Sequence, residues 1–320
     1  MIGAGARQID RALLAAVGCI AVLLFGGALY DRNFLSLDYL LQQLQVASFL
    51  GVVATGVMLV VLLGHIDLSI PWVVTLGGMM STAAAAGYGG LPGWLAIPFA
   101  IACGLAIGTA NGLGVAYLRV PSMIFTLATN AVAQGAMVVH TSGFAPAEQA
   151  TPTMHLLAVE RSILGIPNPV WVWAALGAAI VVVLRRTALG RRIYAIGHSE
   201  RAVFLSRGNV RRVVVACFAL SGGCSAFAGV LLAGYSNKAY QAMGDPYLLP
   251  AIAAVVLGGT RILGGRGTYL GTVAGVVLVT LLQSILSILQ MPEAARQIIY
   301  GAVIIGMLLI YGRGPRTVDG

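Results

Sequence analysis

The sequence has very little charge. Only 9% of its 320 residues are Asp, Glu, Lys or Arg, against roughly 25% in an ordinary soluble domain, and 59% are hydrophobic. A soluble core of this size cannot bury so much apolar surface, so a soluble globular protein is excluded. Several stretches without any charged residue reach the roughly 20 residues that span a bilayer as a helix. These stretches are 68–118, 120–147, 162–184, 213–237, 268–292 and 297–312.

Lysine and cysteine are scarce as well. The single lysine, Lys238, is far from the glycine-rich stretch 258–267, which therefore lacks the Gly-Lys-Ser/Thr of a nucleotide-binding loop and is predicted to be a tight turn. The four cysteines lie singly in apolar runs and are interpreted as small core residues, because no disulfide or zinc spacing is present. They are Cys19, Cys103, Cys217 and Cys224.

Chemically reactive groupings are also missing. The sequence offers no nucleophile beside a base, no carboxylate pair at helical spacing and no metal-ligating cluster, so neither an enzyme nor a bound cofactor is expected. The net charge of +9 comes from arginines beside apolar segments, without aromatic residues between them. This arrangement indicates a membrane protein and not a nucleic-acid-binding one.

Counting the apolar stretches and their breaks predicts an all-α polytopic membrane protein that forms a single transmembrane domain over residues 1–320. The first run follows Arg7 and Arg11 and is long for a signal peptide, so it is expected to remain as a span. About ten helices are predicted, at 12–30, 46–64, 70–88, 94–117, 121–140, 168–185, 213–234, 247–262, 268–290 and 295–311.

Arginine is concentrated in and beside residues 187–212, called the bridge, between the sixth and seventh predicted helices. Basic residues in short loops stay on the cytoplasmic side during insertion, so the bridge and both termini are predicted to be cytoplasmic. The stretch 141–167, with Arg161 as its one basic residue, is then outside. The arginines assigned to the cytoplasmic side are Arg119, Arg185, Arg186, Arg191, Arg192, Arg201, Arg207, Arg211, Arg212, Arg261, Arg266, Arg313 and Arg316.

Glycine, by contrast, is abundant, with 42 residues. Helices in lipid associate through close packing, so small residues at every fourth position are read as helix contacts, with sliding surfaces as the alternative. Helices two to five and seven to ten are offset by an odd number of spans, so any repeat would be inverted. The small-residue stripes are Gly104, Gly108 and Gly112; Ser221, Ser225 and Gly229; and Gly267, Gly271 and Gly275.

Asp67 is the only acid between Tyr39 and residue 147. Together with Ser69 it precedes Pro71, and this order is typical of the cap and first turn of a helix. An unpaired carboxylate at mid-membrane costs about 2.5–3.5 kcal/mol, so the alternative is that it lines a polar translocation path.

A second polar set lies on the fourth and fifth helices. Thr126, Asn130 and Gln134 step by four residues and share one helix face, with Thr129 nearby and Asn111 on the preceding helix. This set offers hydroxyl and amide groups to a polar solute or, alternatively, to neighbouring helices. The candidate path residues are Asp67, Ser69, Asn111, Thr126, Asn130 and Gln134.

Residues 197–208 of the bridge are predicted to form a short surface helix. Ser199 is a suitable N-cap, Glu200 favours the positive helix end, and Gly208 can adopt the left-handed C-terminal conformation. Ala202, Val203 and Phe204 give it an apolar side, which favours docking of a soluble partner over a simple topology anchor. The candidate contacts with that partner are Gly197, His198, Ser199, Glu200, Arg201 and Phe204.

Four segments in order, HIDLS (65–69), NGLGVAYLRVP (111–121), TALGRRIYAIG (187–197) and PAIAAVVLGG (250–259) with GGRG (264–267), resemble the membrane permeases of bacterial ribose/xylose-type ABC importers for monosaccharides. The resemblance covers nearly the whole chain, although His65, Pro71 and Trp72 depart from the family pattern. It implies a bacterial inner-membrane location and an importer with separate subunits. The implied partners are a cytoplasmic ATPase with tandem nucleotide-binding domains, which binds the ATP, a second permease as homo- or heterodimer, an extracytoplasmic solute-binding protein and membrane lipid.

The function expected from this resemblance is uptake of a monosaccharide or related small polar solute. The bridge helix would then be the coupling helix that sits in a cleft of the ATPase. The alternatives are an ABC permease for a branched-chain amino acid, nucleoside or signalling molecule, a passive channel, or an ion-coupled secondary carrier. The carrier would need a titratable group within the bundle, which Asp67 or Asp245 would have to provide.

Overall fold

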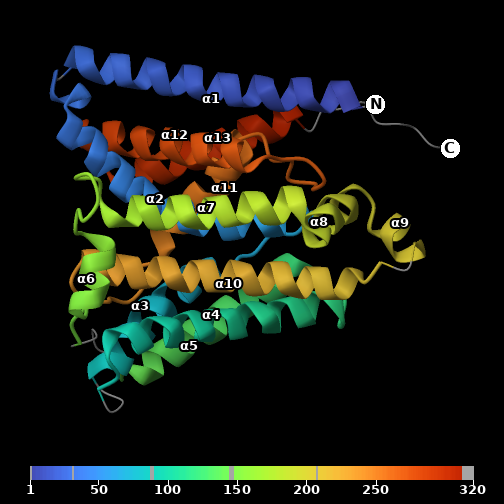
Figure 1. The fold of residues 1–320 in the computed structure, drawn as a ribbon, viewed down its shortest axis with the longest axis horizontal. Coiled ribbons are helices and arrows are strands. Elements are labelled where there is room, and N and C mark those ends of the chain that lie inside the picture. Colours follow the sequence, from blue (N-terminus) through green and yellow to red (C-terminus); the bar gives the residue numbers. More distant parts are fainter. Residues whose placement is uncertain (1, 31, 87–89, 144–147, 207, 312–320) are drawn as a thin grey trace.

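The computed structural model describes residues 2–30, 32–86, 90–143, 148–206 and 208–311, which form a bundle of roughly parallel and antiparallel helices (Figure 1). Two short helices, α8 (Ala188–His198) and α9 (Glu200–Leu205), project from one end, here called the bridge end. The opposite end, here called the far end, carries α6 (Pro152–Ala158). The polytopic all-α fold is thus confirmed.

The ten predicted helices are all present. Six of them are long and apolar enough to cross a membrane: α2, α4, α5, α7, α10 and α12. Two short 3-10 helices, η1 (Arg32–Leu35) and η2 (Asp245–Tyr247), precede α2 and α11. The ten are α1 (Ile2–Tyr30), α2 (Leu37–Leu62), α3 (Ile70–Ala86), α4 (Gly93–Ala116), α5 (Ser122–His140), α7 (Asn168–Arg186), α10 (Val210–Tyr235), α11 (Leu248–Leu257), α12 (Tyr269–Ile288) and α13 (Glu293–Tyr311).

Three predicted boundaries were wrong by more than a few residues, and the first is the start of α1, which lies at Ile2 and not at 12. α2 begins at Leu37 and not at 46, because Ser36 caps it and its polar first turns extend beyond the apolar run. α11 ends at Leu257 and not at 262, because the chain turns through Gly259, whose φ of 85° suits glycine. α6 and α8 were not predicted, and Arg207, Arg313 and Arg316 lie outside the described residues.

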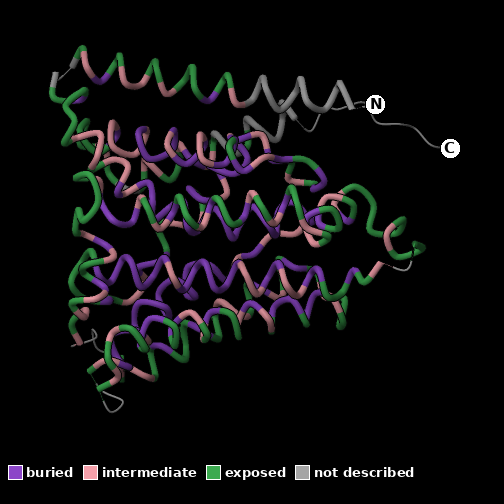
Figure 2. The backbone as a smooth tube through the Cα atoms, in the orientation of Figure 1, coloured by how far each residue is buried: buried purple, intermediate pink, exposed green. Residues whose placement is uncertain are grey.

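The core runs along α2, α3 and α10, which are buried over most of their length (Figure 2). Beyond its polar first turns α2 is apolar on every side, as expected of a helix surrounded by other helices. α1 and α5, in contrast, leave large apolar side chains exposed, as lipid-facing helices do. Cys217 and Cys224 are buried as predicted, whereas Cys19 is exposed on α1 and is not a core residue.

The small-residue stripes lie where helix backbones touch. A Cβ added to Gly108 would meet Phe218 O of α10, and one added to Gly229 would meet Val74 O of α3. On the other side of the bundle, Gly275 of α12 faces Ala254 O of α11 in the same way. Such close approach provides the van der Waals contact that holds helices together in lipid. The structure therefore supports the interpretation of these stripes as helix contacts.

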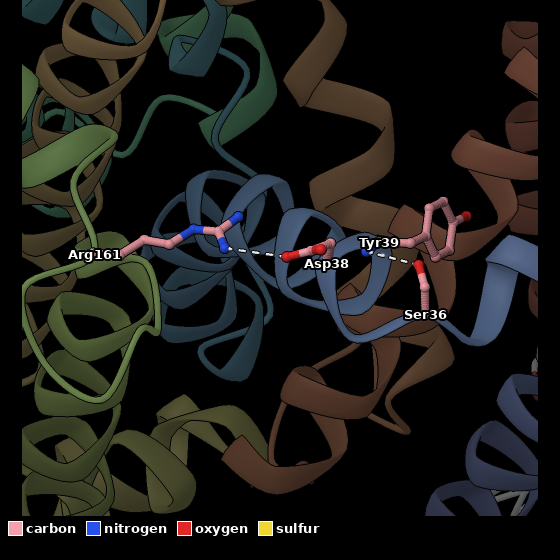
Figure 3. A network of polar contacts seen from close by, with 4 residues as sticks. All are labelled: Ser36, Asp38, Tyr39 and Arg161. Carbon is pink, nitrogen blue, oxygen red and sulfur yellow. Dashed lines mark hydrogen bonds and ion pairs between the residues drawn. The ribbon is translucent and has the colours of Figure 1, made fainter.

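Polar contacts close the far end of the bundle (Figure 3). Ser36 accepts a hydrogen bond from Tyr39 N at 3.3 Å, which caps α2. Asp38, in the first turn of α2, lies 3.5 Å from the Arg161 guanidinium in the loop between α6 and α7. The Asp38 side chain is 92% exposed, so this ion pair contributes little to stability.

Candidate functional site

The chain between α2 and α3, residues 63–69, is not helical although both of its ends are deep in the bundle. Its backbone N–H groups need partners, because lipid provides none. One face of α5 supplies them. Ser122 Oγ accepts from Ile66 N at 3.4 Å, and Thr126 Oγ1 accepts from Leu68 N at 2.9 Å.

The same face of α5 also reaches the first turn of α3. Asn130 Oδ1 accepts a hydrogen bond from Trp72 N at 3.3 Å and so satisfies one of the N–H groups that a helix start leaves free. Ser122, Thr126 and Asn130 follow each other at intervals of four residues. This row of three acceptors, here called the α5 ladder, therefore holds the whole segment from Ile66 to Trp72.

Asp67 is 3% exposed and lies at the centre of a hydrogen-bonded network. Its Oδ1 accepts from Ser69 N at 3.0 Å and from Ser69 Oγ at 2.6 Å, and its Oδ2 accepts from Ser221 Oγ of α10 at 2.9 Å. Asn111 of α4 donates from Nδ2 to Ser69 Oγ at 2.8 Å. The network thus joins the broken segment to α4 and α10 and replaces the water that a carboxylate would otherwise need.

These contacts refine the predictions made for the two polar sets. Ser69 does stand at the start of α3, since its carbonyl accepts from Val73 N at 3.1 Å, but its hydroxyl serves Asp67 and the side-chain cap comes from Asn130. Thr126 and Asn130 bind protein backbone. Gln134, in contrast, is exposed on α5 and lies outside the ladder.

Ser122 and Ser221 are the members of this site that sequence reasoning missed. Ser122 continues the four-residue spacing of Thr126 and Asn130 by one step, so the periodicity alone would have included it. Ser221 belongs to a predicted packing stripe, and only the fold shows that it also faces Asp67.

A second break precedes α11. After α10 ends at Tyr235, residues 236–244 turn back into the bundle and reach the start of α3. Gly244 N donates to Thr75 Oγ1 at 3.2 Å, and a Cβ at Gly244 would collide with Pro71 O. Met243 beside it is fully buried. The chain that leads into α11 therefore lies next to the start of α3 inside the protein.

In the bridge, α8 lies against the bundle by one face. Thr187 caps it by accepting from Gly190 N at 3.2 Å, and Ile193 and Ile196 are buried. Tyr194 donates to Gly267 O at 3.0 Å. Burial raises the pKa of the Tyr194 phenol, despite the charge of Arg185, so the hydroxyl keeps the proton that it donates. The arginines of α8 point to the outside.

α9 confirms the predicted short helix of the bridge. Ser199 accepts from Ala202 N at 3.2 Å as its N-cap, and Glu200 is in its first turn. Phe204 is 66% exposed and Leu205 is 75% exposed, at the tip of the molecule. The left-handed conformation expected of Gly208 was wrong, because that N–H bonds Val203 O at 2.9 Å without a positive φ.

The predicted partner contacts of the bridge separate into two groups. Glu200, Arg201 and Phe204 are exposed on α9, and the Ser199 hydroxyl is used within the helix. His198 is exposed, with its Nδ1 2.9 Å from Tyr194 O. Gly197, in contrast, faces inward, against the last turn of α2 and the α11–α12 turn.

Comparison with known proteins identifies the family. Residues 39–308 match the model of the branched-chain amino acid transport system / permease component family. The chain is 33% identical over 302 residues to the ribose import permease protein RbsC of Haemophilus influenzae, with 94% of this chain and 92% of the relative covered. It is 34% identical over 285 residues to RbsC of Bacillus subtilis, covering 88% and 87%.

A third relative carries a different name. The autoinducer 2 import system permease protein LsrC of Salmonella typhimurium is 31% identical over 311 residues, covering 96% of this chain and 87% of the relative. Family and apolar helices together make this chain a multi-pass inner-membrane protein. The resemblance to permeases of sugar importers is confirmed, and the chain belongs to the branched-chain amino acid transport system / permease component family.

Proposed function

We propose that this chain is the transmembrane permease of an ATP-driven importer that brings a monosaccharide or a related small polar solute into the cytoplasm. The observation that carries the proposal is the near full-length similarity to ribose import permeases at 33–34% identity. The similarity to the autoinducer 2 import permease favours a signalling molecule as the second candidate solute.

The energy would come from a separate cytoplasmic ATPase subunit with tandem nucleotide-binding domains, which binds the ATP. Its docking site on this chain is α9, where Phe204 and Leu205 expose apolar surface and Glu200 and Arg201 add charge. An apolar anchor with charged neighbours is the usual make-up of a protein interface. A helix that served only as a topology marker would have no need to present two large apolar side chains.

The bridge end faces the cytoplasm in this proposal. Among the residues that the structure describes, ten arginines lie in and beside its connecting segments and four basic residues lie at the far end, a bias that follows the positive-inside rule. α1 starts and α13 ends at the bridge end (Figure 1), and the proposal therefore assigns both termini to the cytoplasm. The far end then meets an extracytoplasmic solute-binding protein. The four far-end residues are Arg32, Arg161, Lys238 and Arg296.

The translocation path would follow the polar face of α4 and α5, against a second permease of the same or similar sequence. Asn130 is half-buried, Gln134 is exposed, and Asn111 Oδ1 is buried without a hydrogen-bond partner. A buried unpaired carbonyl oxygen is costly, and a solute hydroxyl would satisfy it. Asp67, Ser69 and Thr126 would support this face of α4 and α5 from the interior of the bundle. Because the binding protein selects the solute, weak polarity suffices in the path.

The test is reconstitution of the permease in proteoliposomes with a cytoplasmic ATPase and a solute-binding protein of the ribose-importer type. Uptake of radiolabelled ribose, xylose and autoinducer 2 is measured with and without ATP on the side of the membrane that carries the ATPase. Uptake that requires all three subunits and ATP supports the importer. Accumulation by the permease alone under a pH gradient would identify a secondary carrier, and equilibration without ATP a channel.

A further inference from the structure

Four glycines from three separate segments meet behind the bridge. Gly64 follows the last turn of α2, Gly197 is near the end of α8, and Gly264 and Gly265 are in the turn between α11 and α12. Gly264 and Gly265 are buried. We call this contact of three backbones the glycine junction. In Figure 1 the α11–α12 turn, coloured orange, lies beside α8.

Side chains are excluded from the junction by its geometry. Gly265 N donates directly to Leu62 O, the last residue of α2, at 2.9 Å. A Cβ on Gly197 would collide with both of those atoms. Gly64, Gly264 and Gly265 also have φ angles of 83°, 85° and 79°, a conformation that other residues rarely adopt.

Two further contacts clamp α8 onto the α11–α12 turn. Tyr194 donates its hydroxyl proton to Gly267 O, and the imidazole of His198 lies next to the position of a Cβ on Gly265. At the junction α8 therefore meets the end of α2 and the α11–α12 turn backbone to backbone, while its buried Ile193 and Ile196 side chains pack against the bundle beside it. Closely packed backbones transmit displacement with little loss, because such contacts hardly compress.

The junction connects the bridge to both breaks of the bundle. Leu62 and Gly64 lead into segment 63–69, which holds Asp67 and starts α3. Gly264 and Gly265 lie in the turn that joins α11 to α12, and the chain before α11 touches the start of α3 at Gly244. A displacement of α8 would thus reach the start of α3 from two directions.

Building on the proposed function, we propose that the glycine junction transmits movement of α8 and α9, driven by the ATPase, to segment 63–69 and to the α11–α12 turn. Gly197 is then a positioning residue for transport and not a contact of the ATPase. Its role is to let α8 touch the end of α2 and the α11–α12 turn at once, so that one movement of the bridge shifts both.

The test compares Gly197→Ala with Gly18→Ala in the complete reconstituted importer. Both glycines are helical, but a methyl group at Gly18 would meet nothing within 4 Å. Copurification of the ATPase, ATP hydrolysis and solute uptake are measured together. We expect Gly197→Ala to keep the ATPase bound and hydrolysing ATP while solute transported per ATP falls at least tenfold, and Gly18→Ala to match the wild type.

An unchanged ratio of solute to ATP in Gly197→Ala overturns the proposal, as does an equal fall in Gly18→Ala. If Gly197→Ala fails to insert or to retain the ATPase, Tyr194→Phe decides, because it removes one junction hydrogen bond and adds no volume. We expect that variant to lower the ratio at least twofold, and an unchanged ratio overturns the proposal. A wild-type complex without ATP-driven uptake would instead refute the proposed function.

Discussion

The α5 ladder allows the energetic cost of one unpaired backbone N–H inside the bundle to be measured. In Thr126→Val the side chain keeps its shape but the acceptor of Leu68 N–H, now at 2.9 Å, is gone. That N–H would be left without a partner inside the protein. Thr129→Val is the matched control, because Thr129 is on the same helix and its hydroxyl only donates to Phe125 O.

The expected magnitude follows from this difference. Each threonine also donates to the carbonyl four residues earlier on α5, Thr126 to Ser122 O and Thr129 to Phe125 O. Each variant loses one such bond, so this loss cancels in the comparison. What remains is one unsatisfied buried N–H, which costs about 1–3 kcal/mol. Thr126→Val should therefore shift the unfolding equilibrium constant relative to Thr129→Val by roughly 5- to 150-fold.

The assay is reversible unfolding of the purified chain in bicelles, with the free energy of unfolding measured for wild type and both variants. The ladder interpretation is refuted if the two valine variants lose the same stability, or if Thr129→Val loses more. Insertion efficiency in vesicles, measured in parallel, checks that both variants enter the bilayer equally.

Three further predictions concern other parts of the molecule. Ser221→Ala should lower the free energy of unfolding by about 1.5–3 kcal/mol, because the Asp67 carboxylate loses a hydrogen-bond donor. Ser225→Ala is the control and should be near neutral, because the buried Ser225 hydroxyl has no partner. Equal losses in the two variants would contradict the network. Asp38→Asn should change unfolding free energy by less than about 1 kcal/mol at any salt concentration, and a larger loss would show a stronger far-end contact. Glu200→Arg combined with Phe204→Asp should abolish ATP-dependent uptake with normal insertion, so unchanged uptake would remove α9 as the docking site.

Much of the fold was predictable because a bilayer constrains sequence so strongly. Apolar runs located all ten predicted helices, and glycine spacing located the contacts of α4 with α10 and of α11 with α12. The capped helix at Ser199 was also predictable, since capping is a local property of a few residues. α8 was missed because its mixture of arginine and isoleucine is amphipathic, and apolar length does not detect that pattern.

The partners of the polar side chains were not predictable. The spacing of Thr126 and Asn130 places them on one face, but whether that face meets solute or protein depends on where segment 63–69 runs. The same holds for Gly197, which has neighbours from α2 and from the α11–α12 turn, more than 60 positions away on either side of the sequence. Long-range contacts of this kind leave no trace in local composition.

The two breaks explain why the polar residues lie where they do. In the predicted pairing of helices two to five with seven to ten, α3 corresponds to α11, and these two helices are the ones preceded by non-helical chain inside the bundle. They run in opposite directions, α3 toward the far end and α11 toward the bridge end, as an inverted pair would.

Each break exposes backbone that lipid cannot satisfy, and in both breaks side chains from the first half of the chain accept these N–H groups. The α5 ladder serves segment 63–69, and Thr75 of α3 serves Gly244. Because Thr75 also donates to Pro71 O, the start of α3 and the start of α11 depend on one side chain. A shift of the first turns of α3 would therefore also break a hydrogen bond of the chain that leads into α11.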